Sequence, residues 1–69
     1  MNLELKINTP VVVDTTKESY LGNFQGYTTI NQLPHLVLTI TNLEKDTIRL
    51  IAVHHIVGIC FEKYGTDRL

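Results

Sequence analysis

The sequence predicts an all-β fold, a small five-stranded, strongly bent antiparallel sheet or barrel that takes up the whole chain of 69 residues as one domain. Apolar and polar residues alternate along much of the chain, which is the period of a half-buried strand. Gly22 and Gly26 lie inside one such segment, where glycine usually marks a bend, a bulge or a close backbone approach. No segment has a convincing helical period, so strands must build the domain.

The N-terminal part of the chain contains two segments separated by Pro10. Alternation over residues 3–7 predicts a short extra N-terminal strand, with a short helix as the alternative. Pro10 cannot donate to a strand ladder, so it predicts a strand start, an edge or a bulge. The β-branched run at residues 11–13 predicts the first strand of the sheet, and the polar residues 14–19 predict a turn.

The central part predicts two further strands. One covers residues 20–29, and Tyr20 and Phe24 share a face of it as core candidates. After it we expect a loop fixed by Pro34, a strand and a turn, at residues 30–35, 36–41 and 42–46.

Residues 47–61 form the longest apolar run, and it is apolar on both faces. One face of a strand in so small a barrel should meet water, so the second apolar face predicts a partner, which we expect to be another copy of the chain. The run is also long for one strand, since about five or six residues are usual. The pair His54-His55 near its middle predicts a turn or sharp bend between two strands.

The composition limits the possible functions. The six basic residues are scattered singly, and there are seven acidic ones. A protein that binds the phosphates of a duplex usually has a clustered basic surface, so this composition argues against duplex binding. Cys60 is the only cysteine, so no internal disulfide can form, and we interpret it as a small buried hydrophobe. A small domain of this kind often depends on oligomerisation. We expect no signal peptide, no membrane span and a cytoplasmic location.

No catalytic constellation is evident in the sequence. It has no glycine-rich phosphate loop that opens a helix, no paired carboxylates in an apolar setting and no supported Ser/His/Asp order. Adjacent residues of a strand point to opposite faces, so His54 and His55 of one chain are poorly placed to chelate one ion. We therefore expect a protein that is not an enzyme and has no cofactor and no metal site.

Two stretches of the sequence resemble the two motifs of the Sm and Sm-like proteins. Residues 11–14 and 20–27 are similar to the first motif, with a valine-rich strand, a turn, and then glycine, a large apolar residue, glycine and an aromatic residue in order. The apolar triplet at 36–38 is like the one that ends this motif. Residues 51–59 resemble the second motif, with the histidine pair at its turn. The resemblance covers roughly residues 11–59 and implies a divergent Sm-like, SH3-like barrel.

The resemblance also implies an assembly and a site. Sm-like proteins form closed homo-oligomeric rings in which the fourth strand of one copy pairs with the fifth of the next, and both of these strands would lie in residues 47–61 here. Family members bind single-stranded RNA at loops beside the central pore. The residues implied for single-stranded RNA or DNA are Tyr27, Thr28, Asn31, Gln32, His35, His54 and His55.

This chain departs from the family pattern at several of these positions. Thr28 and His35 stand where the first motif has aspartate and asparagine. Ala52 and Val53 stand where the second motif has arginine and glycine, while His54 matches a histidine of the bacterial branch. Imidazole can stack on bases and form hydrogen bonds with their edges, which suits single-stranded RNA.

Each candidate also has a structural interpretation. The histidine pair would make a polar turn or an interface, and His35 would be a solvent-exposed loop residue. Asn31 and Gln32 would be ordinary polar loop residues, Tyr27 would make a core or interface contact, and Thr28 would form a bond to the loop backbone. At the level of function, the alternatives are a non-enzymatic oligomeric adaptor or structural ring that acts through protein contacts, and an SH3-like module that binds peptides. The peptide-binding module predicts a monomer.

Overall fold

The computed structural model describes residues 5–41 and 45–61, and the fold there is all-β, as predicted. Five strands and one short 3-10 helix follow each other along the chain. They are β1 (Pro10–Thr15), β2 (Ser19–Ile30), β3 (Leu33–Thr41), β4 (Asp46–Ala52), η1 (Val53–His55) and β5 (Ile56–Phe61). In this part of the chain no helix is long and apolar enough to cross a membrane.

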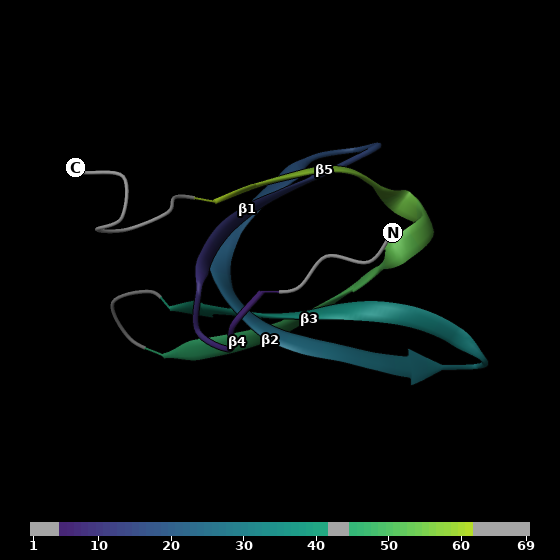
Figure 1. The fold of residues 1–69 in the computed structure, drawn as a ribbon, viewed down its shortest axis with the longest axis horizontal. Helices are drawn as coiled ribbons and strands as arrows, with labels where there is room; N and C mark the ends of the chain where they lie inside the picture. Colours follow the sequence, from purple (N-terminus) through teal and green to yellow (C-terminus); the bar gives the residue numbers. More distant parts are fainter. Residues whose placement is uncertain (1–4, 42–44, 62–69) are drawn as a thin grey trace.

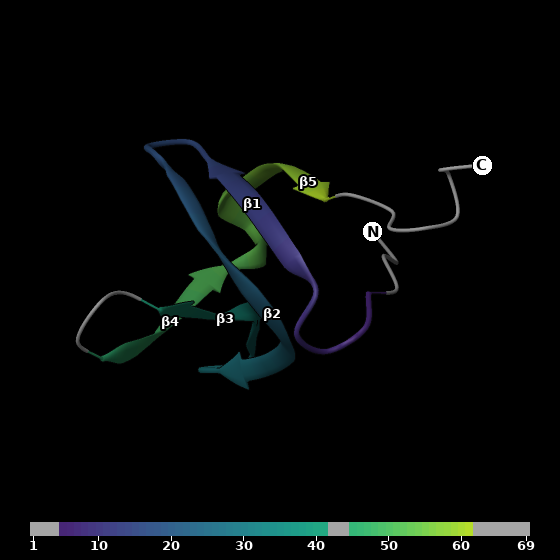
Figure 2. The same ribbon diagram turned by 90° about the vertical axis from the view of Figure 1, so that its left-hand side faces the viewer.

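The strands form one antiparallel sheet in the order β4-β3-β2-β1-β5. The sheet is strongly bent: β1 and β5 lie on one side of the molecule, β3 and β4 on the other, and β2 passes between the two sides (Figures 1 and 2). The two strands at the ends of this order, β4 and β5, are joined through η1. The long apolar run is therefore divided in two at the histidine pair, as predicted.

The two glycines of β2 have the roles that the sequence predicts for them. A Cβ added at Gly22 would lie 2.6 Å from the carbonyl oxygen of Thr39, so only glycine allows this close approach of β2 to β3. Gly26 has a φ of 105° and lies within a register shift between Phe24 and Tyr27, which is a β-bulge. Together, the close contact and the bulge allow the long strand β2 to curl.

The core lies between the two sides of the bent sheet. Its buried side chains come from every strand except β5, and they alternate along β1 and β3, as the period-two pattern requires. They are Val11, Val13, Phe24, Leu36, Leu38 and Ile51. The core assignment of Phe24 is confirmed, whereas Tyr20 is only partly buried and packs against the cluster.

Two predictions about the ends of strands are wrong. The described residues before Pro10 form a turn rather than an extra strand, because the carbonyl of Lys6 accepts bonds from the backbone N–H and the hydroxyl of Thr9 (3.1 and 2.6 Å). Residues 1–4 lie outside the described part. Nor is there a loop at residues 30–35: β2 and β3 are joined by Asn31 and Gln32 alone, both at positive φ (52° and 67°). This is the tight hairpin turn whose twist matches the twist of paired strands.

Pro34 lies inside β3 rather than in a loop, opposite Thr29 of β2. The pairing of β3 with β4 ends at His35 and Ala52, so the missing N–H of Pro34 removes no bond to β4. Cys60 is also placed differently from the prediction: it is exposed. It pairs with Val12, which in turn pairs with the exposed Leu21, so its side chain lies on the outer face of the sheet.

Candidate nucleic-acid interface

The strand register brings several predicted site residues to one end of the bent sheet. Thr28 of β2 pairs with His35 of β3, and His35 pairs with Ala52 of β4. The chain continues from Ala52 directly into η1, which carries His54 and His55. Residues that are distant in sequence therefore form one row across three strands, followed by the histidine pair.

Asn31 and Gln32 lie at the tip of the hairpin, beyond this row. Two further residue pairs, Thr29–Pro34 and Ile30–Leu33, separate the tip from His35. At about 3.4 Å per residue, the tip lies roughly 10 Å beyond His35. Both tip residues are exposed, so their amides extend the candidate surface outward rather than closing it.

His54 and His55 lie in a helical turn, not in a strand. Their ring centroids are 4.2 Å apart at an interplanar angle of 61°, and both side chains are exposed. The prediction that the two rings point to opposite faces is therefore wrong, because it assumed strand geometry. The turn is fixed from outside η1, since the carbonyl of His55 accepts a bond from the N–H of Thr16 (3.1 Å).

His35 has one ring nitrogen occupied. Its Nδ1 lies 3.0 Å from the carbonyl oxygen of Leu33. A carbonyl can only accept, so Nδ1 is the donor in this contact, and Nε2 is the ring nitrogen left for another partner. The half-buried imidazole is thus oriented by its own strand and still offers a nitrogen to a base edge.

Tyr27 is 48% exposed, and its ring meets that of Phe24 edge to face (centroids 5.3 Å apart, 69°). The contact anchors Tyr27 to the core, while the rest of the ring meets solvent. The arrangement combines the two interpretations of this residue, because one edge packs against the core and one surface is free for stacking.

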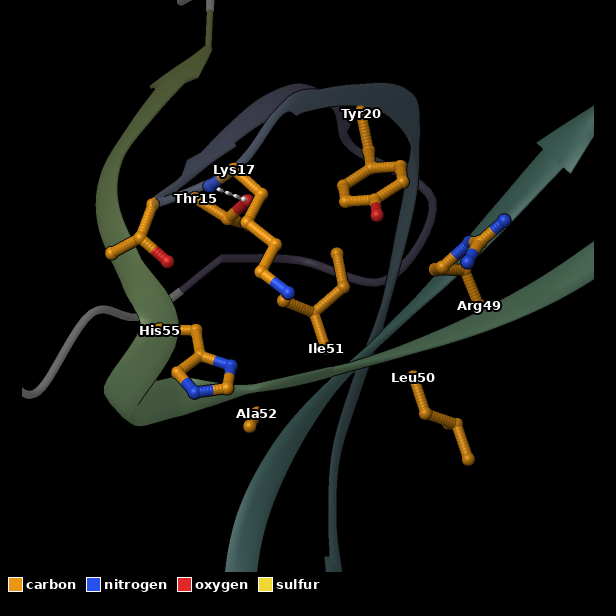
Figure 3. Close-up of a pocket in the computed structure, with 9 residues that line it drawn as sticks. Thr15, Lys17, Tyr20, Arg49, Leu50, Ile51, Ala52 and His55 are labelled. Carbon is orange, nitrogen blue, oxygen red and sulfur yellow. Dashed lines mark hydrogen bonds between the residues drawn. The ribbon is translucent and has the colours of Figure 1, made fainter.

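A pocket of about 170 Å³ opens beside the histidine turn (Figure 3). It lies between the β1–β2 turn and β4, two segments that the bend of the sheet brings together. Of the predicted site residues, all within the described ranges, His55 alone lines it. The full lining is Thr15, Thr16, Lys17, Tyr20, Arg49, Leu50, Ile51, Ala52 and His55.

Sequence reasoning missed Lys17, Tyr20 and Arg49 as a group. The guanidinium carbon of Arg49 lies 4.9 Å from the centroid of the Tyr20 ring, a cation–π contact. The Tyr20 hydroxyl donates to Oε2 of Glu18 (2.7 Å). This hydrogen bond raises the pKa of Tyr20, desolvation and the charge of Glu18 act in the same direction, and the charge of Arg49 opposes them.

Metal ligands are not gathered anywhere in the described ranges. No group of three or more histidine, cysteine, aspartate or glutamate side chains there could hold an ion. The side chains available for binding in this region are instead hydrogen-bonding imidazoles and amides, one half-exposed tyrosine, and the cations Lys17 and Arg49.

Comparison of the chain with protein-family models, with curated proteins and with solved structures gave no match.

Proposed function

We propose that this chain is a ring-forming Sm-like protein that binds single-stranded RNA, or single-stranded DNA, at the end of the sheet that carries the histidine pair. The proposal rests on the motif resemblance together with one observation from the structure. The row Thr28–His35–Ala52 runs directly into His54 and His55, so residues that the resemblance implies for nucleic acid lie together.

The chemistry of this row suits bases better than phosphates. Imidazoles and side-chain amides form hydrogen bonds with base edges, and a half-exposed aromatic ring offers a stacking surface. Within the row and the hairpin tip no lysine or arginine is present. Binding there would therefore rely on unpaired bases, which a duplex does not present.

The edges of the sheet support the ring. In the described sheet β4 and β5 are the two edge strands, and an edge strand presents unpaired backbone groups to a further strand. Each edge also carries an apolar side chain turned to solvent, Ile48 on β4 (68% exposed) and Val57 on β5 (67%). Pairing β4 of one copy with β5 of the next would satisfy the backbone and cover these side chains.

The mass of the protein in solution tests the ring. We expect light scattering after size exclusion to give a mass several times 7.9 kDa. The double variant Ile48→Lys/Val57→Lys should give a smaller species, because charges are then buried at the interface. Leu21→Lys is the matched control, since Leu21 is equally exposed (68%) but lies on the inner strand β2. A monomeric wild-type chain would contradict the ring and favour a peptide-binding module.

Fluorescence anisotropy with labelled oligo(U), oligo(A) and oligo(dT) tests the binding. We expect a titratable rise for at least one strand at low salt, and a loss of about tenfold or more when His35, His54 and His55 are all replaced by alanine. Lys6→Ala, in the exposed N-terminal turn, is the control and should bind as the wild type does. No binding of any single strand would contradict the proposal.

A structural ring or adaptor that works through protein contacts is the second candidate. The observation that favours it is the exposure of large apolar side chains on the outer face, with Leu21, Ile48 and Leu50 exposed by 68%, 68% and 45%. A purified partner that binds the ring with unchanged affinity after nuclease treatment, and equally well when the histidines are replaced, would favour this candidate.

A further inference from the structure

The pocket beside the histidine turn is lined by two cations, Lys17 and Arg49. Within the described residues, neither the ammonium of Lys17 nor the guanidinium of Arg49 has a carboxylate within 4.0 Å. The nearby carboxylate of Glu18 accepts a hydrogen bond from the Tyr20 hydroxyl (2.7 Å) and forms an ion pair with neither cation. Two cations that line one concave surface without such a partner favour an anion there.

The geometry of the pocket positions the side chain of Arg49 and the backbone of Lys17. Arg49 is held over the ring of Tyr20, so the guanidinium loses less freedom when it binds a ligand. In Figure 3 the side chain of Lys17 extends from the β1–β2 turn into the space between His55 and Tyr20. The pocket is therefore crossed by one cation and bordered by the other.

The turn that carries Lys17 is itself fixed by hydrogen bonds. The hydroxyl of Thr15 accepts from the N–H groups of Lys17 (3.2 Å) and Glu18 (3.0 Å), and it donates to the carbonyl of Glu18 (2.7 Å). The N–H of Thr16 donates to the carbonyl of His55 (3.1 Å), which ties the turn to η1. The backbone below Lys17 is thus joined to the predicted nucleic-acid site.

The size and lining of the pocket indicate the class of anion. A volume of about 170 Å³ lies below the roughly 300–1,000 Å³ of pockets that enclose drug-sized ligands, so it suits an anionic group rather than a whole nucleotide. Arg49 offers the planar fork that matches phosphate oxygens, while Thr16 and His55 add hydrogen-bonding groups. The buried Ile51 supplies the apolar floor of the pocket, whereas the side chain of Leu50 points away from it (Figure 3).

We propose that this pocket binds a phosphate group of the single strand, held by Lys17 and Arg49, next to the bases read by the histidine row. This inference rests on the proposed function. Two adjoining sites would then share His55. The row contacts bases, and the pocket binds one phosphate.

The salt dependence of strand binding tests the proposal. For single strands, the slope of log K against log salt falls by about 0.7 for each phosphate contact that is lost. We expect Lys17→Gln/Arg49→Gln to bind oligo(U) or oligo(A) about tenfold more weakly at low salt and to lower the slope by about 0.7. Lys6→Gln, which removes an exposed charge outside the pocket, should lower neither, and Lys17→Arg should retain most of the affinity.

Two further experiments distinguish a failure of the pocket proposal from a failure of the proposed function. Oligonucleotides with a 5′-phosphate or a 5′-hydroxyl distinguish a terminal phosphate from a backbone phosphate. If the wild-type chain binds strands and the folded double variant binds with the same affinity and slope, the pocket proposal is overturned while the proposed function stands.

If no strand binds, an NMR titration with inorganic phosphate at millimolar concentration tests whether the pocket binds phosphate by itself. Shifts confined to the amides of Thr16, Lys17, Arg49 and His55 would support a phosphate pocket. No shifts, or shifts caused only by a peptide with a free C-terminal carboxylate, would overturn it.

Discussion

The two halves of β2 differ in how the rest of the molecule holds them. The first half pairs with β1 from Ser19 to Asn23, makes the close contact at Gly22, and ends at the buried Phe24. The second half, beyond the bulge at Gly26, pairs with β3, and each of its residues from 27 to 30 is exposed. One strand therefore builds the core and a wall of the pocket at one end, and projects a hairpin with candidate base contacts at the other.

This difference indicates where the chain tolerates change. Substitutions at the inward positions of the first half, such as Gly22 and Phe24, disturb the packing of a core that contains few fully buried side chains. Substitutions in the second half act on backbone conformation and on the exposed surface. Stability and binding can therefore be altered separately. We expect the larger losses of stability from substitutions in the first half.

Gly22→Ala should have the largest effect on stability. Its Cβ would lie 2.6 Å from a backbone oxygen of Thr39 and 2.9 Å from Cγ of Leu38, so β2 and β3 would have to separate. We expect a loss of about 3 kcal/mol in the free energy of unfolding, measured by urea denaturation. Gly58→Ala is the matched control, because its nearest neighbour would be Oδ2 of Asp14 at 3.8 Å. Equal effects of the two substitutions would contradict the close packing of the first half.

Gly26→Ala should cost less, because only the backbone resists it. The added Cβ would meet nothing closer than Cδ1 of Ile7 at 3.7 Å, but a φ of 105° is strained for an L-residue. We expect a loss of about 1–2 kcal/mol in urea denaturation. A neutral result would mean that β2 bends without a positive φ at this bulge.

Much of this architecture follows from local patterns in the sequence. Alternation locates the strands, Gly22 and Gly26 identify the bend, and the polar pair in the longest apolar run locates the break at η1. The hairpin turn was missed because Asn31 and Gln32 lack the glycine that usually signals two positive φ values, while Pro34 suggested a loop.

The pocket could not be predicted from local patterns. Its residues come from the β1–β2 turn, from β4 and from η1, and only the bend of the sheet brings these segments together. Alternation assigns Tyr20 and Arg49 to faces of their strands but gives no sign that one stacks on the other. The histidine pair was located correctly, whereas its ring geometry depended on a helical turn that a period of two cannot indicate.

Gln32→Gly should stabilise the hairpin at the end of the second half. Gln32 has a φ of 67°, a region that is unfavourable for most L-residues, and the change creates the Asn-Gly pair preferred in such turns. Part of the gain is offset by the greater freedom of glycine in the unfolded chain, so we expect about 0.5 kcal/mol. Asn31→Gly is the control and should gain less, because asparagine tolerates positive φ. A loss of stability on Gln32→Gly would contradict the turn conformation.

The smallest effect concerns the ionisation of Tyr20, the aromatic residue of the first half. Glu18→Gln removes the carboxylate that raises the pKa of Tyr20 and leaves the opposing charge of Arg49, so the pKa should fall toward or below its ordinary value. NMR signals of the Tyr20 ring followed against pH measure this. Asp14→Asn is the control, since that carboxylate accepts from Ser19 (2.5 Å) and not from Tyr20.

The sign of the linked effect on stability follows from this direction. A phenol whose pKa is higher in the folded chain than in the unfolded chain stabilises the fold below the unfolded pKa, and this contribution is lost as pH rises through the folded value. The free energy of unfolding of the wild type should therefore fall more steeply above about pH 10 than that of Glu18→Gln. Parallel curves for the two proteins would mean that the bond between Tyr20 and Glu18 does not hold the first half of β2 in solution.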